Sequence, residues 1–422
     1  MIRIIEPRKI AFISSFLPRK CGIATFASDL IGNIGKAGGI EFKPSVVAIQ
    51  SEHEHRYTKP VEFTIRKDIT ADYIDAADHL NSRNVELISL QHEFGLFGGE
   101  GGSHISLLLN RLEAPIVTTL HTILEKPSPE YFRALIDVCD KSETVIVMNE
   151  RGIQMLIDIY GIPKRKVKLI PHGIPDISFS LKNLHKQSLG LSKRKIILTF
   201  GLIGRNKGIE VMLKAMPAII KKHPDILYII LGMTHPEVVK HEGYSYKNEL
   251  LDLVKELNIQ NHIIFYDKFV SDPVLKQFLS ASEIYVTPYL YKEQLTSGTL
   301  AFAVGAGKAV VSTPYWAAEE LLAGGRGKLV PFGNSEQMAL AIIELLDNNS
   351  VLNQMQLRAY EYGREMIWSK IGETYWNLFT EKLSNILSTP DLKTNLRDLD
   401  VIKSRPATDK TIHPMNPIFL MD

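Results

Sequence analysis

The stretch "YKEQLTSGTLAFAVGAGKAVVSTPYW" (291–316) places an acidic residue just before the start of an expected helix. Ser297 can cap a helix that begins at Gly298, because its hydroxyl can accept a hydrogen bond from an N–H group of the first turn. The N–H groups that remain free there, with the helix dipole, favour an anion such as a phosphate. Glu293 can accept hydrogen bonds from hydroxyl groups and stabilise developing positive charge. The stretch predicts an anion site with a carboxylate at its edge; the alternative is that Glu293 only points to solvent.

A second candidate anion site lies in "FGLIGRNKGIEVMLKA", where Arg205 and Lys207 stand in a glycine-punctuated loop between an expected strand and an expected helix. Two cations beside a helix N-terminus can hold a diphosphate. The alternative is a solvated basic turn. The spacing does not fit Gly-x-Gly-x-x-Gly, and the chain has no Gly-x4-Gly-Lys-Ser/Thr, so neither a nicotinamide fingerprint nor a Walker loop is present.

Polar residues also follow the strands expected in the first half of the chain. In "FLPRKCGIATFASDL", Gly22 lets the backbone approach a ligand where a helix begins near Ile23, although a tight turn explains the glycine equally well. Ligands of open parallel sheets bind beyond the carboxyl ends of the strands. We therefore expect His121, at the end of the fourth run, to lie in a cleft.

The segment "QHEFGLFGGEGG" contains five glycines in the eight residues 95–102, and this composition predicts a mobile loop. His92 and Glu93 lie at its base, and Gly98 and Gly99 at its centre. A single histidine is usually a satisfied polar residue. Because His92 and His121 end adjacent strands, we expect both to face the cleft.

The histidine-rich segment "SEHEHRY" (51–57) can be interpreted as a metal chelator or as a solvated loop. We favour the loop, because no distant set of metal ligands accompanies it.

The elements that must position these residues read as short β-branched runs alternating with helical patterns, which is typical of α/β proteins with parallel sheets. Two series of about six runs predict two doubly wound sheets, each in a domain of about 170–190 residues. We expect the boundary within 176–195. The runs are "KIAFISSF", "PSVVAIQ", "VELISLQ", "PIVTTLH", "ETVIVMN" and "KVKLIPHG", then "RKIILTFG", "ILYIILG", "HIIFYDK", "EIYVTPY", "KAVVSTP" and "GKLVPF".

The composition is that of an ordinary soluble enzyme: 422 residues, 45% hydrophobic and 23% charged, with a net charge of +2. This balance argues against a dedicated nucleic-acid or polybasic membrane binder. The two cysteines, Cys21 and Cys139, are typical of a reducing compartment, and no apolar run of 18 residues predicts a membrane span. We expect a cytoplasmic protein whose N-terminus is a first strand rather than a signal peptide.

About residues 8 to 388 resemble the family 4 retaining glycosyltransferases, which have GT-B architecture. "GLIGRNKGIEVMLKAMP" resembles the phosphate loop of that family, and "KEQLTSGTLAFAVGAGKAVVSTPYWAAEELLAGGRGKLVPF" resembles its Glu-x7-Glu region. "LIPHGIPD" resembles the link between the two domains. "MIWSKIGETYWNLF", which contains Trp368, is similar to the helix that crosses back to the N-terminal domain.

The resemblance implies two facing Rossmann-like, doubly wound parallel-sheet domains with a C-terminal crossing helix. The expected segments are an acceptor-binding domain (1–180), a nucleotide-sugar-binding domain (181–367), the crossing helix (368–388) and an irregular tail (389–422). A hexose would pass from a nucleoside-diphosphate sugar to a hydroxyl acceptor with retention of configuration. Neither a metal nor another cofactor would be needed.

The resemblance also assigns site residues. Glu293 would contact the sugar hydroxyls, His121 would stand near the reacting centre, and Lys207 would neutralise the diphosphate. The full set of donor-binding candidates is Gly22, Arg205, Lys207, Phe269, Val270, Ser297, Gly298, Thr299 and Glu320. The acceptor-side candidates are His92, Glu93, Gly98 and Gly99.

The sequence departs from the family pattern at two places. The arginine that often stands five residues before the lysine is Leu202 here, and we expect Arg205 to substitute for it. The second glutamate of the Glu-x7-Glu motif, which normally holds the ribose, falls on Phe302. The residue eight positions before Phe302 is Gln294, so Glu293 lies one position away from the motif's first glutamate.

Two other functions stay open: a sugar-nucleotide 2-epimerase of GT-B architecture, and a non-catalytic sugar-nucleotide-binding protein. Among donors, the look of 293–316 favours GDP-mannose over UDP-glucose and suggests polysaccharide biosynthesis. The acceptor would be a glycan or a lipid-linked molecule, with at most peripheral membrane contact and no nucleic-acid partner.

Overall fold

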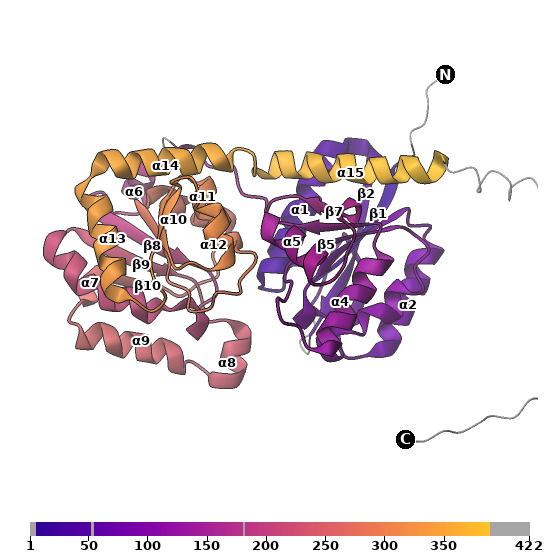
Figure 1. Ribbon diagram of the computed structural model, residues 1–422, viewed down its shortest axis with the longest axis horizontal. Helices are drawn as coiled ribbons and strands as arrows, with labels where there is room; N and C mark the ends of the chain where they lie inside the picture. The colour runs from indigo at the N-terminus through magenta and orange to yellow at the C-terminus, as the bar shows by residue number, and fades with distance from the viewer. Residues whose placement is uncertain (1–5, 52–54, 180–181, 389–422) are drawn as a thin grey trace, which may run out of the picture. The chain divides into compact units, whose positions relative to one another are not determined.

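Alternating strands and helices build the chain (Figure 1), and the computed structural model describes residues 6–51, 55–179 and 182–388. The first sheet consists of β1 (Arg8–Ser14), β2 (Phe42–Gln50), β3 (Val61–Arg66), β4 (Leu87–His92), β5 (Ile116–Leu120), β6 (Thr144–Val147) and β7 (Val167–Leu169). The second consists of β8 (Lys195–Phe200), β9 (Ile226–Leu231), β10 (Ile263–Tyr266), β11 (Ile284–Thr287), β12 (Ala309–Ser312) and β13 (Gly327–Leu329).

The helices lie between and after these strands. The α-helices are α1 (Gly22–Gly38), α2 (Thr70–Ser82), α3 (Ile105–Leu109), α4 (Pro129–Lys141), α5 (Glu150–Asp158), α6 (Lys182–Ser188), α7 (Ile209–Lys222), α8 (Pro236–Glu242), α9 (Ser245–Glu256), α10 (Asp272–Ala281), α11 (Gly298–Gly305), α12 (Trp316–Leu321), α13 (Ser335–Asp347), α14 (Asn349–Gly363) and α15 (Trp368–Ser388).

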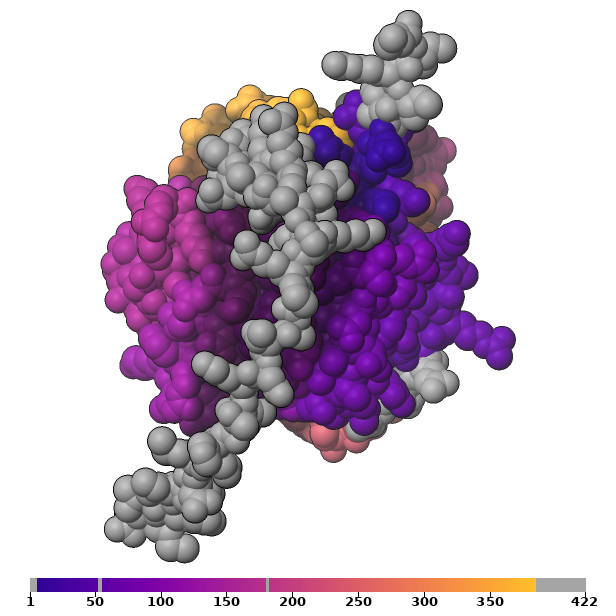
Figure 2. Space-filling view, turned by 90° about the vertical axis from the view of Figure 1, so that its right-hand side faces the viewer, coloured from indigo at the N-terminus to yellow at the C-terminus, as the bar shows by residue number. Residues whose placement is uncertain are grey.

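Both sheets are parallel and doubly wound. Their strand orders are β3-β2-β1-β4-β5-β6-β7 and β10-β9-β8-β11-β12-β13, and every strand pair within them is parallel. This confirms the predicted fold class of two Rossmann-like domains. Residues of the first sheet domain, indigo to magenta, form most of the coloured surface visible in Figure 2.

One strand of the first sheet, β3, was not predicted. β3 lies at the edge of the sheet, and Ile65 is its only buried residue among six. An edge strand that is half exposed has no continuous apolar run, so its sequence "VEFTIR" resembles a polar connection. The sheet therefore has seven strands where about six were expected.

The core of the second sheet explains why its strands are so apolar. Ile197 and Tyr228 pack with α7, α9 and α13 on one face, while Leu198 and Ile229 pack with α10 and α11 on the other. Alternate residues of a strand point to opposite faces, so a sheet covered on both faces needs apolar residues at nearly every position.

The strand order reverses at one point in each sheet, between β1 and β4 and between β8 and β11. In open α/β sheets, ligands bind at this switch point, beyond the carboxyl ends of the strands. The loops after these four strands, with the first turns of the helices that follow them, contain most of the candidate residues, including Lys207 and Glu293. The topology therefore positions the candidate site.

Two chain segments run side by side between the sheets, within one compact unit that extends to Asn377. Ile174 bridges to Ile367, its N–H donates to Met366 O at 2.9 Å, and its carbonyl accepts from Trp368 N at 2.9 Å. Farther along α15, Tyr375 OH lies 3.0 Å from Thr119 Oγ1. The first ten residues of α15 thus pack on the first sheet domain.

The predicted irregular tail (389–422) lies outside the described residues, as do residues 52–54 of the histidine-rich segment. Among the residues that are described, no helix is both long and apolar enough to cross a membrane. In the same ranges, no group of three or more His, Cys, Asp or Glu residues is arranged to hold a metal ion. The division of the chain into four functional segments stays a prediction.

Candidate functional site

The loop between β8 and α7 packs tightly against the loop that follows β11. Gly208 has a φ of 60°, and a Cβ added to it would lie 2.1 Å from Pro288 O, so only glycine fits there. The N–H of Leu290 donates to Asn206 O at 3.1 Å and joins the two loops. The contact brings the cationic loop next to the segment that leads into α11.

Lys207 presents its charge toward this junction. Its Nζ lies 4.0 Å from the centroid of the Tyr289 ring, a cation–π contact, and Tyr289 OH lies 3.1 Å from Thr299 Oγ1 in the first turn of α11. No acid of the described chain forms an ion pair with Lys207. The ammonium group is therefore available to an anion near the start of α11. Tyr289 was not predicted; the available signal was an aromatic residue two positions after the end of a buried strand.

Arg205 is held differently from Lys207. Its Nη1 and Nη2 donate to Glu249 at 2.8 and 2.7 Å, and its Nε donates to Glu242 at 2.9 Å. The hydrogen bonds that the guanidinium donates to Glu249 and Glu242 raise its pKa. Two carboxylates already neutralise this cation, so its role in a diphosphate clamp stays a prediction.

Helix α11 begins where the sequence predicted. Ser297 is buried and caps the helix, since its Oγ accepts from Leu300 N at 3.4 Å. The N–H groups of Gly298 and Thr299 have no acceptor in the described part of the chain. These two groups and the positive end of the dipole can bind an anion.

The backbone around Glu293 is fixed, while its side chain is exposed. Trp316 and Ala317, in the first turn of α12, donate their N–H groups to Lys292 O at 3.0 Å and Gln294 O at 3.1 Å. These bonds anchor the residues on both sides of Glu293. Its carboxylate makes no ion pair or hydrogen bond with any described residue, so it can accept one from a ligand.

Phe302 occupies the place of the second glutamate and acts as a packing residue. Its ring lies 6.3 Å from that of Phe200 and 6.0 Å from that of His172. Glu320, the other carboxylate expected to bind donor, accepts from the N–H of Glu150 at 3.0 and 3.1 Å, at the N-terminus of α5. Both carboxylate oxygens of Glu320 share this one N–H donor.

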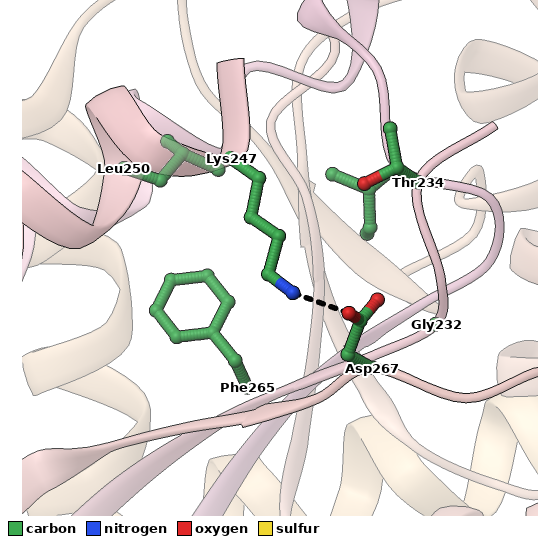
Figure 3. A pocket seen from close by; sticks show the side chains of 7 residues that line it. Gly232, Thr234, Lys247, Leu250, Phe265 and Asp267 are labelled. Atoms are coloured by element: carbon green, nitrogen blue, oxygen red, sulfur yellow. Dashed lines mark hydrogen bonds and ion pairs between the residues drawn. The ribbon is translucent and has the colours of Figure 1, made fainter. Parts of the chain in front are cut away.

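Phe269 and Val270 follow β10, where Phe269 is exposed and Val270 is partly buried against the core. Near the carboxyl ends of β9 and β10 a small cavity of about 10 Å³ lies under α9, and Figure 3 shows Thr234 and the Lys247–Asp267 ion pair on its walls. The space is enough for one water molecule only. The cavity is therefore too small for a nucleotide.

The start of α1 is open to solvent. Cys21 Sγ accepts from Ala24 N at 3.4 Å and caps the helix. A Cβ added to Gly22 would meet no heavy atom within 4 Å. Space beside Gly22 fits the expected close approach of a ligand, although nothing in the packing requires glycine.

His121 is partly buried and held in place. Its Nε2 lies 3.0 Å from Gln91 Oε1, and the Phe26 ring packs edge-on at 5.0 Å. Burial, together with the nearby imidazoles of His172 and His92, lowers the pKa of His121 to about 3. The imidazole is therefore neutral near pH 7 and can donate or accept a hydrogen bond.

The expectation that His92 faces the cleft is wrong. Its side chain is fully buried, and neither ring nitrogen has a hydrogen-bond partner among the described residues. It lies between Phe94 and Phe97, with ring centroids 5.1 and 5.9 Å away. His92 is on the face of β4 that packs on apolar residues, opposite to Gln91, and burial lowers its pKa to about 4.

The glycine-rich segment is packed at its centre. A Cβ added to Gly98 would lie 2.0 Å from Lys67 O, and one on Gly99, whose φ is 76°, would lie 2.5 Å from Ser103 Oγ. These glycines are needed for close packing, not only for flexibility. Glu93, at the base, accepts from Thr122 Oγ1 at 2.6 Å, while burial raises its pKa.

His172 was missed, although it stands near the end of the last run of the first half, "KVKLIPHG". A Cβ added to Gly298 would lie 2.9 Å from His172 Nε2, so this imidazole lies against the start of α11. Gly173 is required beside it, because a Cβ there would lie 2.2 Å from the Trp368 ring. A cavity of about 30 Å³ is lined by His172, Ser297 and Glu320, among others.

Comparison with known proteins shows which proteins this chain is similar to. Residues 182–366 match the model of the glycosyl transferases group 1 family. Spore coat protein SA of Bacillus subtilis is 25% identical over 208 residues, which span 48% of this chain and 50% of that protein. Phosphatidyl-myo-inositol mannosyltransferase of Mycolicibacterium smegmatis is 24% identical over 268 residues, which span 63% of this chain and 64% of that enzyme.

Solved structures agree with the observed fold. The crystal structure of Anabaena Alr3699/HepE in complex with UDP has a TM-score of 0.70 and 18% identity, and the match covers 88% of this chain and 100% of that one. At this identity the likeness establishes the fold alone, which is GT-B. The two curated relatives named above match over 50% and 64% of their own length.

Proposed function

We propose that this protein is a family 4 retaining glycosyltransferase that moves a hexose from a nucleoside-diphosphate sugar to a hydroxyl acceptor. The observation that carries the proposal is the meeting of Lys207 with the N-terminus of α11 through Tyr289 and Thr299. One unpaired cation and two free N–H groups make a site for a diphosphate. The match of 182–366 to a glycosyltransferase family supports this assignment.

The chemical roles follow from charge. As the glycosidic bond to the diphosphate breaks, negative charge grows on the leaving group and positive charge on the anomeric carbon. Lys207 and the α11 N–H groups stabilise the first, and the carboxylate of Glu293 the second. His121, which is neutral, positions a hydroxyl group by hydrogen bonding.

The donor proposed is GDP-mannose in preference to UDP-glucose, and the acceptor is a glycan or lipid-linked molecule. The name of one relative, a phosphatidyl-myo-inositol mannosyltransferase, supports mannose. Because Alr3699/HepE was crystallised with UDP, uridine donors should be tested beside GDP-mannose.

Lys207 and the helix N–H groups can supply the stabilisation that a divalent ion gives in other transferases, so we propose that no metal or cofactor is required. Activity should then persist in EDTA. Complete loss on chelation with recovery in manganese would show a metal-dependent enzyme.

A panel of nucleotide sugars tests the function. One donor should raise the melting temperature of the protein and be hydrolysed slowly without acceptor, and NMR of the transfer product should show a retained anomeric configuration. If no donor binds, the proposal fails. A donor that changes its sugar without acceptor would indicate a 2-epimerase, and a donor that binds but is never consumed would indicate a binding protein.

A further inference from the structure

His172 lies at the point where the proposed diphosphate site meets the connection between the two sheets. Its ring packs edge-on against Phe26 of α1 at 5.0 Å and contacts Phe302 of α11 at 6.0 Å. On a third side it contacts Trp368 of α15 at 6.1 Å. These rings fix the plane of the imidazole and place its Nε2 against Gly298.

The hydrogen bond on the other nitrogen determines what Nε2 offers. Nδ1 lies 2.7 Å from Gly173 O, and a carbonyl can only accept, so Nδ1 carries the proton of the neutral ring. Nε2 then points a lone pair toward the first residue of α11. A phosphate bound at that helix end would meet this lone pair, and the contact is favourable only when Nε2 is protonated.

The surroundings keep the ring neutral as long as no anion is present. Burial lowers the pKa of His172 to about 4, while the bond to Gly173 opposes this shift. Helices α1, α11 and α15 present the uncharged rings named above. The ionisable groups around the ring are His121, whose pKa His172 lowers, and two residues of the shared cavity, Glu320 and Tyr362.

We propose that His172 is a further ligand of the donor diphosphate, and that it takes a proton from solvent when the diphosphate binds. The inference rests on the proposed function, because it uses the same anion site. The charge balance is simple: one proton moves from solvent to Nε2, and the imidazolium then donates one hydrogen bond to a phosphate oxygen. His172 thus links nucleotide affinity to pH.

Calorimetric titration of the full chain with GDP and with UDP tests this link. The titrations are run at pH 7 in buffers of different ionisation enthalpy, which gives the number of protons taken up on binding. The His172→Asn variant is the main comparison, because its amide can still donate to Gly173 O but cannot titrate. Protons released by the nucleotide itself cancel in the difference between the two proteins.

We expect the wild-type protein to take up more protons than His172→Asn, and the variant to bind roughly tenfold more weakly, as suits the loss of a charge-assisted hydrogen bond. The exposed histidine variant His241→Asn should behave as wild type. His172→Gln provides a second variant if His172→Asn does not fold, and melting curves check both.

Equal proton uptake by wild type and His172→Asn would overturn the inference. So would loss of uptake in His121→Asn alone, which would make His121 the titrating group. Failure of the wild-type protein to bind any nucleoside diphosphate is a different result, because it would remove the proposed function itself.

Discussion

The carboxyl ends of the two sheets carry opposite kinds of chemical groups. At the second sheet, the side chain of Glu293 is exposed, and Lys207 forms no ion pair with a described residue and lies near the start of α11. At the first sheet, His121 and Glu93 are desolvated and hydrogen-bonded to neighbouring side chains. Burial favours the neutral form of both residues.

The difference indicates which substrate each domain is suited to bind. A diphosphate brings several negative charges, and a site with unpaired cationic and N–H groups can bind it without first breaking protein contacts. A hydroxyl acceptor is neutral, so it needs hydrogen-bond partners that do not themselves attract the charged diphosphate. The second domain therefore suits the donor, and the first suits the acceptor.

The largest expected effect tests the carboxylate of the second domain. Glu293→Gln should lower turnover by roughly 10²–10³-fold, the cost of removing one preorganised electrostatic group from a transition state. The measurement is the rate of transfer, or of donor hydrolysis, at saturating donor. Glu336→Gln, at an exposed position on α13, is the matched control and should be unchanged. Near-wild-type turnover in folded Glu293→Gln protein would move the catalytic carboxylate elsewhere.

The next effect tests the cation. Lys207→Ala should weaken donor binding by tens of fold, since a charge-assisted contact is worth roughly 1.5–3 kcal/mol. Titration with the nucleoside diphosphate measures this directly. Lys214→Ala, an exposed lysine on α7, should leave affinity unchanged. If both variants bind equally well, the charge asymmetry between the domains has no role in donor binding.

The acid stability of the first domain provides a test that needs no substrate. The pKa of His92 falls from its usual 6.5 to about 4 on folding. Between these two pH values the unfolded chain binds a proton at His92, and the folded chain does not. The contribution of neutral His92 to the free energy of unfolding is therefore complete above pH 6.5, and it is lost as the pH falls toward 4. Between pH 7 and pH 5 this amounts to about 2 kcal/mol.

Urea unfolding at these two pH values measures the loss. His92→Leu removes the titrating group, so its stability should depend less on pH by about the same amount. The pKa values of His121 and His172 are lowered in the same direction and by at least as much, so His92→Leu should keep about two thirds of the wild-type dependence. An unchanged pH dependence in His92→Leu would mean that His92 titrates in the folded protein as it does in the unfolded chain.

The fold and part of the site could be predicted from the sequence because they depend on local patterns. Apolar runs predicted both parallel sheets except β3, whose residues alternate at an edge. The cap at Ser297 depends on residues within one helical turn. The face of β4 on which His92 lies could not be predicted from a local pattern. It depends on how the following loop, with Phe94 and Phe97, packs on the strand.

Arg205 and Lys207 show the limit most directly. They are two residues apart in one loop and looked equivalent in sequence. Glu242 at the end of α8 and Glu249 on α9 bind Arg205, and they lie 37 and 44 residues farther along the chain. No short-range sequence pattern connects these acids with Arg205. His172 was missed for a related reason, since Gly298 becomes its neighbour only when the chain folds.

The smallest expected effect separates these two cations. Arg205→Ala should weaken nucleoside-diphosphate binding by only about threefold or less, because Glu242 and Glu249 already compensate its charge and exposed ion pairs are worth little. Titration of Arg205→Ala beside Lys207→Ala gives the ratio of the two losses. The double variant Glu242→Gln/Glu249→Gln sharpens the test: it frees the guanidinium, and affinity should rise above that of wild type if Arg205 can reach the phosphates. A loss in Arg205→Ala as large as that in Lys207→Ala would show that the arginine leaves its acids when donor binds, and that both cations form the clamp.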